Sequence, residues 1–314
     1  MRYNNSLCIL LIIIMILVNF IGCTNNEKSK IEQLEILQVE QNKTIEESKD
    51  KIINSQKFMH ISLDDFIEAF KDISINKDKY NSIFENETFK LLRKMHEKYG
   101  AVFSCYTYYE NDTSDFNLSM CTDKYKDEFF NNKEWLKFGF HSYNGSENYE
   151  NTSGEKAKSD YGLFIKELLR ITGSEESIDR VIRLQNFAGN DESIIQIRNA
   201  DYGIKGLLGA DDKRRTYNLD NNENSYLYLY DYYEDSGLYY FRTDLRLENT
   251  EDIEKVLDEF EQNKKFKEKN EILIVFTHEW QLTNSDIKEK LEKCCKFANN
   301  SGYCFDYPMN RINE

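Results

Sequence analysis

The sequence lacks the short motifs that identify many nucleotide-binding and metal-binding proteins. It has no GxGxxG or Walker-type loop, so the nucleotide-binding forms of an open parallel sheet lose their main support. It also has no CxxC pair and no Cys/His zinc spacing. Besides Cys8 and Cys23 there are five cysteines, an odd number that includes the adjacent Cys294 and Cys295. This pattern does not suggest a disulfide framework.

Basic side chains are in deficit. The 314 residues include 41 Lys and Arg against 56 Asp and Glu, and the formal net charge is −15. Nucleic-acid binders depend on Lys and Arg to neutralise phosphates, so we expect no nucleic-acid partner. Aromatic residues make up 14% of the chain, which argues against wholesale disorder because disordered chains lack such apolar bulk.

The hydrophobic run from Leu7 to Ile21 follows Arg2 and is too short to span a membrane comfortably, since a spanning helix needs about 20 residues. It fits a secretory signal, and the stretch 20–23 resembles a bacterial lipoprotein signal in which Cys23 carries the lipid. We therefore expect a signal peptide over 1–22, and a lipid anchor at the extracellular face of the membrane. An uncleaved N-terminal anchor is the alternative.

The remaining chain divides into a polar stretch and a folded part. Residues 23–57 are rich in Lys and Glu and are interpreted as a tether. Apolar runs and helical periodicity then alternate over residues 58–314. Strands are expected at 58–63, 101–106, 136–141, 180–184, 203–208, 238–242, 272–276 and 303–306. Helices are expected at 67–73, 87–99, 156–172, 192–199, 250–260 and 285–299, with Gly173 as a C-cap.

This alternation predicts an α/β fold, a deformed (β/α) barrel with seven or eight mostly parallel strands. An open doubly wound sheet is the structural alternative. In a parallel barrel, functional side chains collect at the carboxyl ends of the strands. Polar groups do follow the expected strands, as the residues Asp64, Asp65, His141, Arg183, Gln185, Asp244, Glu248, His278, Glu279 and Trp280 show.

Three short motifs resemble those of the polysaccharide deacetylases. Residues 60–65 (His-Ile-Ser-Leu-Asp-Asp) are similar to that family's Ser/Thr-Phe-Asp-Asp motif, residues 139–142 to its His-Ser motif, and residues 276–278 to its late-strand histidine motif. The resemblance covers roughly residues 58–312. It implies a deformed barrel that removes acetyl groups from a glycan with one divalent metal ion, zinc.

The resemblance also implies roles for individual residues. Asp64 would be the general base, His278 the general acid, and Asp65 and His141 metal ligands. Arg183 would position the base, and Gln185, Glu279, Trp280 and Asp244 would bind or orient the substrate. Amide hydrolysis needs an activated water, a Lewis acid and a proton donor, which these residue types and the metal would supply.

One departure from the family's pattern concerns the metal. The family has a second histidine four residues after the first, and Gly145 stands there in this chain. A catalytic zinc site normally has three protein ligands, so Asp65 and His141 need a third. Structural roles are the alternative for each candidate: a helix cap for the Asp pair, packing for His141, and a rim contact between His278 and Trp280.

Three functions remain open from the sequence. The first is a surface-anchored, metal-dependent deacetylase. The second is a carbohydrate-binding barrel that has lost part of the metal site. In it the tyrosines of 226–233, a stretch expected to be an inserted strand or loop at one end of the barrel, would stack on sugar rings. The third is a structural or host-facing surface module, which would have no need of polar residues gathered at strand ends.

Overall fold

The computed structural model describes residues 57–212, 214–261 and 272–312. The expected signal peptide, the lipidation site Cys23 and almost all of the expected tether lie outside these residues and stay predictions. The division of the chain into 1–22, 23–57 and 58–314 likewise stays a prediction. Within the described residues, no helix is both long and apolar enough to cross a membrane.

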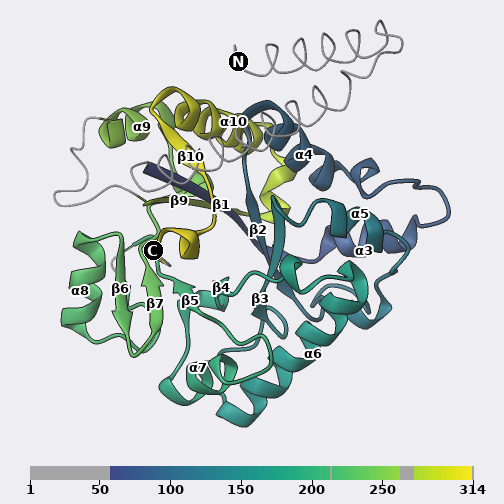
Figure 1. Cartoon of the computed structure of the whole chain (residues 1–314), viewed down its shortest axis with the longest axis horizontal. Helices are drawn as coiled ribbons and strands as arrows, with labels where there is room; N and C mark the ends of the chain where they lie inside the picture. The colour runs from purple at the N-terminus through teal and green to yellow at the C-terminus, as the bar shows by residue number, and fades with distance from the viewer. Residues whose placement is uncertain (1–56, 213, 262–271, 313–314) are drawn as a thin grey trace, which may run out of the picture. The chain divides into compact units, whose positions relative to one another are not determined.

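A parallel sheet forms the larger part of the strand framework (Figure 1). Its central strand, β1 (Lys57–Phe66), pairs in parallel with β2 (Phe103–Tyr108), β9 (Ile272–His278) and β10 (Tyr303–Phe305). Beyond these, β3 (Leu136–Ser142) pairs with β2, and β8 (Leu245–Arg246) with β9. Eight of the ten residues of β1 are buried, so both faces of the strand are covered.

A second sheet follows β3 around the barrel. Its order is β4 (Val181–Ile182), β5 (Gly206–Leu208), β7 (Leu238–Phe241) and β6 (Tyr232–Asp235), with β6 antiparallel to β7. A parallel bridge from Phe138 to Ile178 connects β3 to the segment before β4. Asp244, just before β8, donates its backbone N–H to Ile274 of β9. The two sheets therefore form one deformed, mostly parallel barrel, as predicted.

Helices cover the outside of the strands. In Figure 1, α4, α9 and α10 lie on one side of the strands and α6 and α7 on the other. The α-helices are α3 (Glu68–Ile75), α4 (Glu87–Tyr99), α5 (Lys126–Asn131), α6 (Gly154–Thr172), α7 (Asp191–Arg198), α8 (Asn221–Leu229), α9 (Ile253–Glu261) and α10 (Ser285–Asn300). Short 3-10 turns are η1 (Ile83–Glu85), η2 (Leu118–Met120), η3 (Glu175–Ser177), η4 (Gln185–Phe187), η5 (Leu247–Asn249), η6 (Glu279–Thr283) and η7 (Pro308–Arg311).

Helix α6 shows how an apolar stripe is placed against the barrel. Its buried residues Tyr161, Phe164 and Leu168 recur at helical spacing, so they share one face. The rings of Tyr161 and Phe164 lie 5.6 and 5.4 Å from that of Phe140 on β3. The helix ends at Gly173 with a φ of 70°, a left-handed conformation that glycine adopts at no steric cost. The predicted C-cap is confirmed.

Two expectations about element bounds need correction. The second strand was expected to end at Tyr106, but β2 continues to Tyr108 and so carries one more inward-facing side chain to the site. The tyrosine-rich stretch 226–233 was expected to be an inserted strand or loop. It instead contains the end of α8 and the start of β6, because a capping box at Asp220 and Glu223 starts a helix there.

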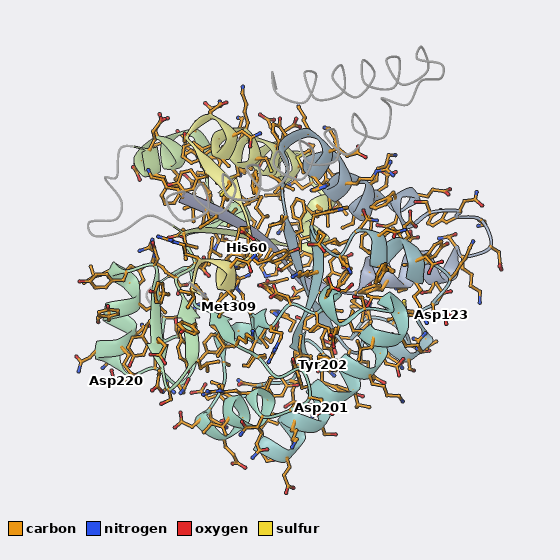
Figure 2. All side chains as sticks on the ribbon, in the orientation of Figure 1. His60, Asp123, Asp201, Tyr202, Asp220 and Met309 are labelled. Atoms are coloured by element: carbon orange, nitrogen blue, oxygen red, sulfur yellow. The ribbon has the colours of Figure 1, made fainter. Side chains whose placement is uncertain are left out.

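Alternate residues of β1 face the barrel interior, which is partly polar. Ser62 accepts a hydrogen bond from Arg183, and Asp64 lies two residues further along the same face. His60, near the centre of Figure 2, is fully buried and shares a hydrogen bond through Nδ1 with the Asp306 carbonyl. Burial lowers the pKa of His60 to about 3, so this ring is neutral at physiological pH.

The interior requires glycine at position 139 of β3. A Cβ atom there would lie 2.7 Å from Tyr106 Cδ1 and 3.1 Å from Ile182 Cγ2. We expect Gly139→Ala to lower the free energy of unfolding by about 1–3 kcal/mol, because overpacking forces neighbours out of place. The matched control is Gly162→Ala on the exposed face of α6, where a Cβ atom meets nothing within 4 Å.

The control substitution is expected to raise the free energy of unfolding by about 0.5–1 kcal/mol, through helix propensity. Urea unfolding of both variants checks the pair. A Gly139→Ala variant as stable as the wild type would show that the Tyr106 ring has room to move.

Candidate functional site

The carboxyl ends of the barrel strands surround a small cavity of about 80 Å³. A cavity of this size has room for several water molecules or for a small pendant group of a ligand. Its wall is polar on most sides, with two phenylalanines. The lining residues are Asp64, Asp65, His141, Arg183, Leu184, Gln185, Asn186, Phe187, Arg214, Arg246, Phe276 and His278. Six of the residues expected from the sequence therefore meet at one place.

A bulge at the end of β1 lets two consecutive aspartates face this cavity. Leu63 pairs with Cys105 and Phe66 with Thr107, so three steps along β1 match two along β2. Side chains alternate between faces in a regular strand, and an extra residue breaks that alternation. Asp65 lies in the bulge and has a φ of 56°, a left-handed conformation that aspartate tolerates better than most residues.

Asp64 forms a buried ion pair with Arg183. The guanidinium Nη1 donates to Asp64 Oδ1 at 2.8 Å and also lies 2.9 Å from Ser62 Oγ, while Nη2 donates to Thr243. The exposed fractions of Asp64 and Arg183 are 2% and 1%. The guanidinium also lies over the Phe276 ring, 4.0 Å from its centroid. Removing one partner would leave a buried charge without compensation, which is strongly destabilising.

Asp65 is surrounded by polar side chains from four elements, and two of them donate hydrogen bonds to it. The Tyr108 hydroxyl donates to Oδ1, and Trp280 Nε1 donates to Oδ2 at 3.1 Å. His141 Nε2 lies 3.3 Å from Oδ1, and His278 Nε2 lies 4.0 Å from Oδ2. Burial acts to raise the pKa of Asp65. The hydrogen bond and charge of His141, together with the bond from Tyr108, outweigh it and hold the pKa below its usual range.

The orientation of His141 is set from the fourth strand. Its Nδ1 is hydrogen-bonded to the Arg183 carbonyl, and because a carbonyl only accepts, Nδ1 carries the proton. Nε2 is therefore the nitrogen that faces Asp65. Burial and the charge of Asp65 raise the pKa of the neighbouring Tyr108, so the phenol remains a donor at physiological pH.

His278 forms a second charged pair, with Glu248. Nδ1 of His278 is hydrogen-bonded to Glu248 Oε1, and Thr277 donates to Glu248 Oε2 at 2.8 Å. Burial acts to lower the pKa of His278, but the bond to Glu248 and the charges of Asp64 and Asp65 raise it overall. For Glu248, burial acts in the opposite sense and the bond from His278 lowers the pKa overall.

Two of the expected substrate-binding residues have other partners. Glu279 is buried, and its carboxylate accepts hydrogen bonds from the backbone N–H groups of three consecutive residues, 67–69, at the start of α3. Asp244 is also buried; it accepts from Arg242 and from the backbone N–H of Ile274, and does not line the cavity. Both carboxylates are used to hold the protein together, so the expectation that they bind or orient substrate directly is corrected.

The other two residues expected to bind or orient substrate, Gln185 and Trp280, lie at or beside the cavity. Gln185 lines the cavity, with Oε1 2.8 Å from the Tyr108 hydroxyl. Trp280 lies beside the cavity residue Asp65 and is 56% exposed. An exposed indole next to buried polar groups is a suitable stacking face for a flat ligand.

A catalytic zinc ion does not fit the residues present. Two ligand atoms about 2.1 Å from one ion are separated by about 3.4 Å at a tetrahedral angle, which the 3.3 Å between His141 Nε2 and Asp65 Oδ1 approaches. The described residues do not supply a third ligand beside these two. In the described part of the chain, no three His, Cys, Asp or Glu side chains are grouped to hold a metal.

Gly145 explains the missing ligand. A Cβ atom there would lie 2.5 Å from Asp112 Oδ2 and 3.6 Å from the Tyr108 hydroxyl. The Asp112 carboxylate thus occupies space that a side chain at 145 would need. Together with the two donors already bound to Asp65, this leaves a hydrogen-bonded network at the place of the expected metal site.

Sequence reasoning missed Tyr108 and did not assign Glu248 to His278. Tyr108 was missed because the second strand was expected to stop two residues earlier. Glu248 lies 30 residues before its histidine, and only the pairing of β8 with β9 brings them together. Arg214 and Phe187 also belong to the cavity wall but lack any motif that would have singled them out, whereas Arg246, which also lines the cavity, follows an expected strand.

No family model and no curated protein matches the chain. Among solved structures, it is similar to a family 4 acetyl xylan esterase from Clostridium thermocellum in complex with a cobalt ion, at 10% identity and a TM-score of 0.48 over 82% of this chain and 90% of that one.

Two other solved structures are a CE4 family pseudoenzyme from Bacillus anthracis and a CE4 esterase from Streptococcus mutans. Their identities are 9% and 13% and their TM-scores 0.45 and 0.41, over 83% and 82% of this chain and 67% and 89% of theirs. At such low similarity no residue role is transferred from them.

The His278–Glu248 pair predicts how stability depends on pH. A raised histidine pKa gives stability that is present below pH 6.5 and lost as the pH rises through the folded-state value. A lowered glutamate pKa gives stability that is present above pH 4.5 and lost as the pH falls through the folded-state value. Between these limits we expect Glu248→Gln to cost about 1–3 kcal/mol, with a smaller cost on either side.

Urea unfolding from pH 4 to pH 9 measures this difference. The control is Glu254→Gln, because Glu254 pairs with Lys293 at 3.1 Å on the surface with 74% of its side chain exposed. The control is expected to change stability little at any pH. A cost of Glu248→Gln that does not vary with pH would mean that the pair is not charged in the folded protein.

Proposed function

We propose that this protein is a glycan-binding member of the deacetylase-like barrels whose site holds its ligand without a metal ion. The observation that carries the proposal is the hydrogen bonding of the Asp65 carboxylate. Both of its carboxylate oxygens accept hydrogen bonds from the protein, one from Tyr108 and one from Trp280. The position that would complete a metal site is a glycine facing Asp112.

The dimensions of the site support a ligand with a small pendant group. A cavity of about 80 Å³ suits an acetyl or similar substituent of a few atoms better than a whole sugar ring. The ring itself would lie outside, against the exposed indole of Trp280, where its C–H face packs on the aromatic face. Phe187 and Phe276 supply apolar wall for a methyl group.

The charged pairs supply the polar contacts for such a ligand. His278 has its Nδ1 bonded to Glu248, so its Nε2 is the nitrogen available to donate to a ligand carbonyl. Asp64 is held by Arg183 and presents its carboxylate at the cavity wall, where it accepts from an amide N–H or a hydroxyl. These contacts recognise an acetylated amino sugar through both its carbonyl and its N–H.

A metal-dependent deacetylase is the second candidate. It is favoured by the same two pairs, because Asp64 beside Arg183 and His278 beside Glu248 are the groups that a base and an acid would need. Hydrolysis in this family's manner would also need the metal, for which the described residues supply Asp65 and His141. Release of acetate from an acetylated oligosaccharide by the purified protein would favour this candidate over simple binding.

Attachment to the membrane surface is also part of the proposal. It is supported by the lipoprotein-like stretch 20–23 and would place the barrel outside the cytoplasmic membrane. Labelling with a radioactive fatty acid should mark the wild-type chain but not Cys23→Ala. Equal labelling of both would remove the lipid anchor from the proposal.

Binding predicts a specific dependence on Trp280. Titration calorimetry with an N-acetylated amino-sugar oligosaccharide should give the same Kd with and without chelator. Trp280→Ala should weaken binding about tenfold, because loss of one stacking face is worth about 1.4 kcal/mol. The matched control is Phe130→Ala, an exposed aromatic residue on α5 that does not line the cavity. Binding that disappears with chelator would contradict the proposal.

Restoring the missing ligand should change the metal affinity. In the double variant Gly145→His with Asp112→Ala, the added imidazole gains the space that Asp112 occupied, so Asp65, His141 and the new histidine can share one ion. We expect zinc to bind at least about tenfold more tightly than to wild type, measured by competition with a chromophoric chelator. Asp112→Ala alone is the control. Tight zinc binding by wild type would show that the site is complete already.

A further inference from the structure

Three consecutive residues at the junction of β9 and η6 have three different partners. His278 pairs with Glu248, Trp280 donates its indole N–H to Asp65, and Glu279 between them is turned away from the cavity. Glu279 is 5% exposed, and burial raises its pKa to about 7 against the effect of its three backbone hydrogen bonds. A carboxylate buried to this degree next to the site needs a structural reason.

That reason is the start of α3. A helix has N–H groups in its first turn without partners in the helix, and a side chain at the N-cap normally accepts from one or two of them. The N-cap position of α3 is Ile67, which makes no side-chain cap. Glu279 accepts instead from Ile67 and Glu68 at 2.8 Å and from Ala69 at 2.7 Å. The helix is therefore capped by a residue more than two hundred positions away.

The capped residues follow directly on the bulge that aims Asp65. Asp65 has a left-handed backbone, which persists only where the surroundings enforce it. On one side of Asp65, β1 is held by its ladders to β2 and β9, and on the other the chain is held by the bonds from 67–69 to Glu279. Since Glu279 is also the neighbour of Trp280, the same residue fixes both ends of the Trp280–Asp65 hydrogen bond.

We propose that Glu279 is a positioning residue of the binding site, which sets Asp65 and Trp280 relative to each other by capping α3 from η6. Its effect on glycan affinity rests on the proposed function. Its effect on the Trp280–Asp65 contact does not, because that contact exists in the free protein.

The two tryptophans of the chain provide a direct readout. Each indole N–H donates to a side chain, Trp280 to Asp65 at 3.1 Å and Trp135 to Asn132 at 2.9 Å. In a nitrogen–proton correlation spectrum they give two indole resonances, assigned with Trp280→Phe. In Glu279→Ala we expect the Trp280 resonance to shift upfield and to exchange faster with water, while that of Trp135 stays in place.

Asp220→Ala is the matched control for loss of a helix cap. Asp220 caps α8 by accepting from the backbone N–H groups of Asn222 and Glu223, and it lies at the margin of the molecule in Figure 2. Its substitution should lower the melting temperature as cap loss does, without moving the Trp280 resonance. Glu279→Gln, which keeps an accepting oxygen, should shift the Trp280 resonance less than Glu279→Ala, and it decides the test if the alanine variant does not fold.

We expect the Trp280 indole resonance to shift in both Glu279 variants and to stay in place in Asp220→Ala. Binding of the acetylated oligosaccharide should be about tenfold weaker in Glu279→Ala. A Glu279 variant that loses stability but keeps the wild-type Trp280 resonance would overturn the inference, because the residue would then be only a cap. If the Trp280 resonance moves but no variant, wild type included, binds the oligosaccharide, the positioning role stands and the proposed function fails.

Discussion

The site depends on one extra residue in β1. Two consecutive aspartates in a regular strand would face opposite sides of the sheet, and only one could reach the cavity. The bulge between Leu63 and Phe66 turns both inward, with Asp65 in a left-handed conformation. Each aspartate then has different partners. Asp64 pairs with the buried Arg183, whereas Asp65 accepts hydrogen bonds from Tyr108 and Trp280 and lies beside His141. Glu279 stabilises the geometry from outside by capping the helix that follows.

The charges around the cavity are arranged as pairs that satisfy each other within the protein. Asp64 has Arg183, Glu248 has His278, Arg246 has Asp211, and the Asp65 carboxylate has Tyr108 and Trp280. Each oxygen of the central carboxylate, Asp65, already accepts one hydrogen bond from the protein, and a glycine, Gly145, stands where a further ligand would be expected. This internal satisfaction is the physical reason for preferring ligand binding through hydrogen bonds and stacking over metal-assisted hydrolysis.

Elements with strong periodicity could be predicted closely from the sequence. The apolar run at 272–276 and the helical stripe at 156–172 correspond to β9 and α6, and the barrel follows from their alternation. Tyr108 could not be found, because a two-residue difference in the end of a strand is within the uncertainty of any pattern. The roles of Glu279 and Asp244 were misjudged because position after a strand does not reveal whether a carboxylate faces a cavity or a helix terminus.

The amino-acid sequence by itself determined the alternation of strands and helices, the polar residues at strand ends, and the glycine at position 145, since these depend on local periodicity and on residue type. Tertiary structure alone decided which polar groups meet. Asp65 and Trp280 are 215 positions apart, and Ile67 and Glu279 are 212 apart, so each contact exists only because parallel strands bring their carboxyl ends to one edge. A hydrogen bond forms only when donor and acceptor lie about 3 Å apart, and the pattern of residue types along the chain does not show which distant side chains come that close.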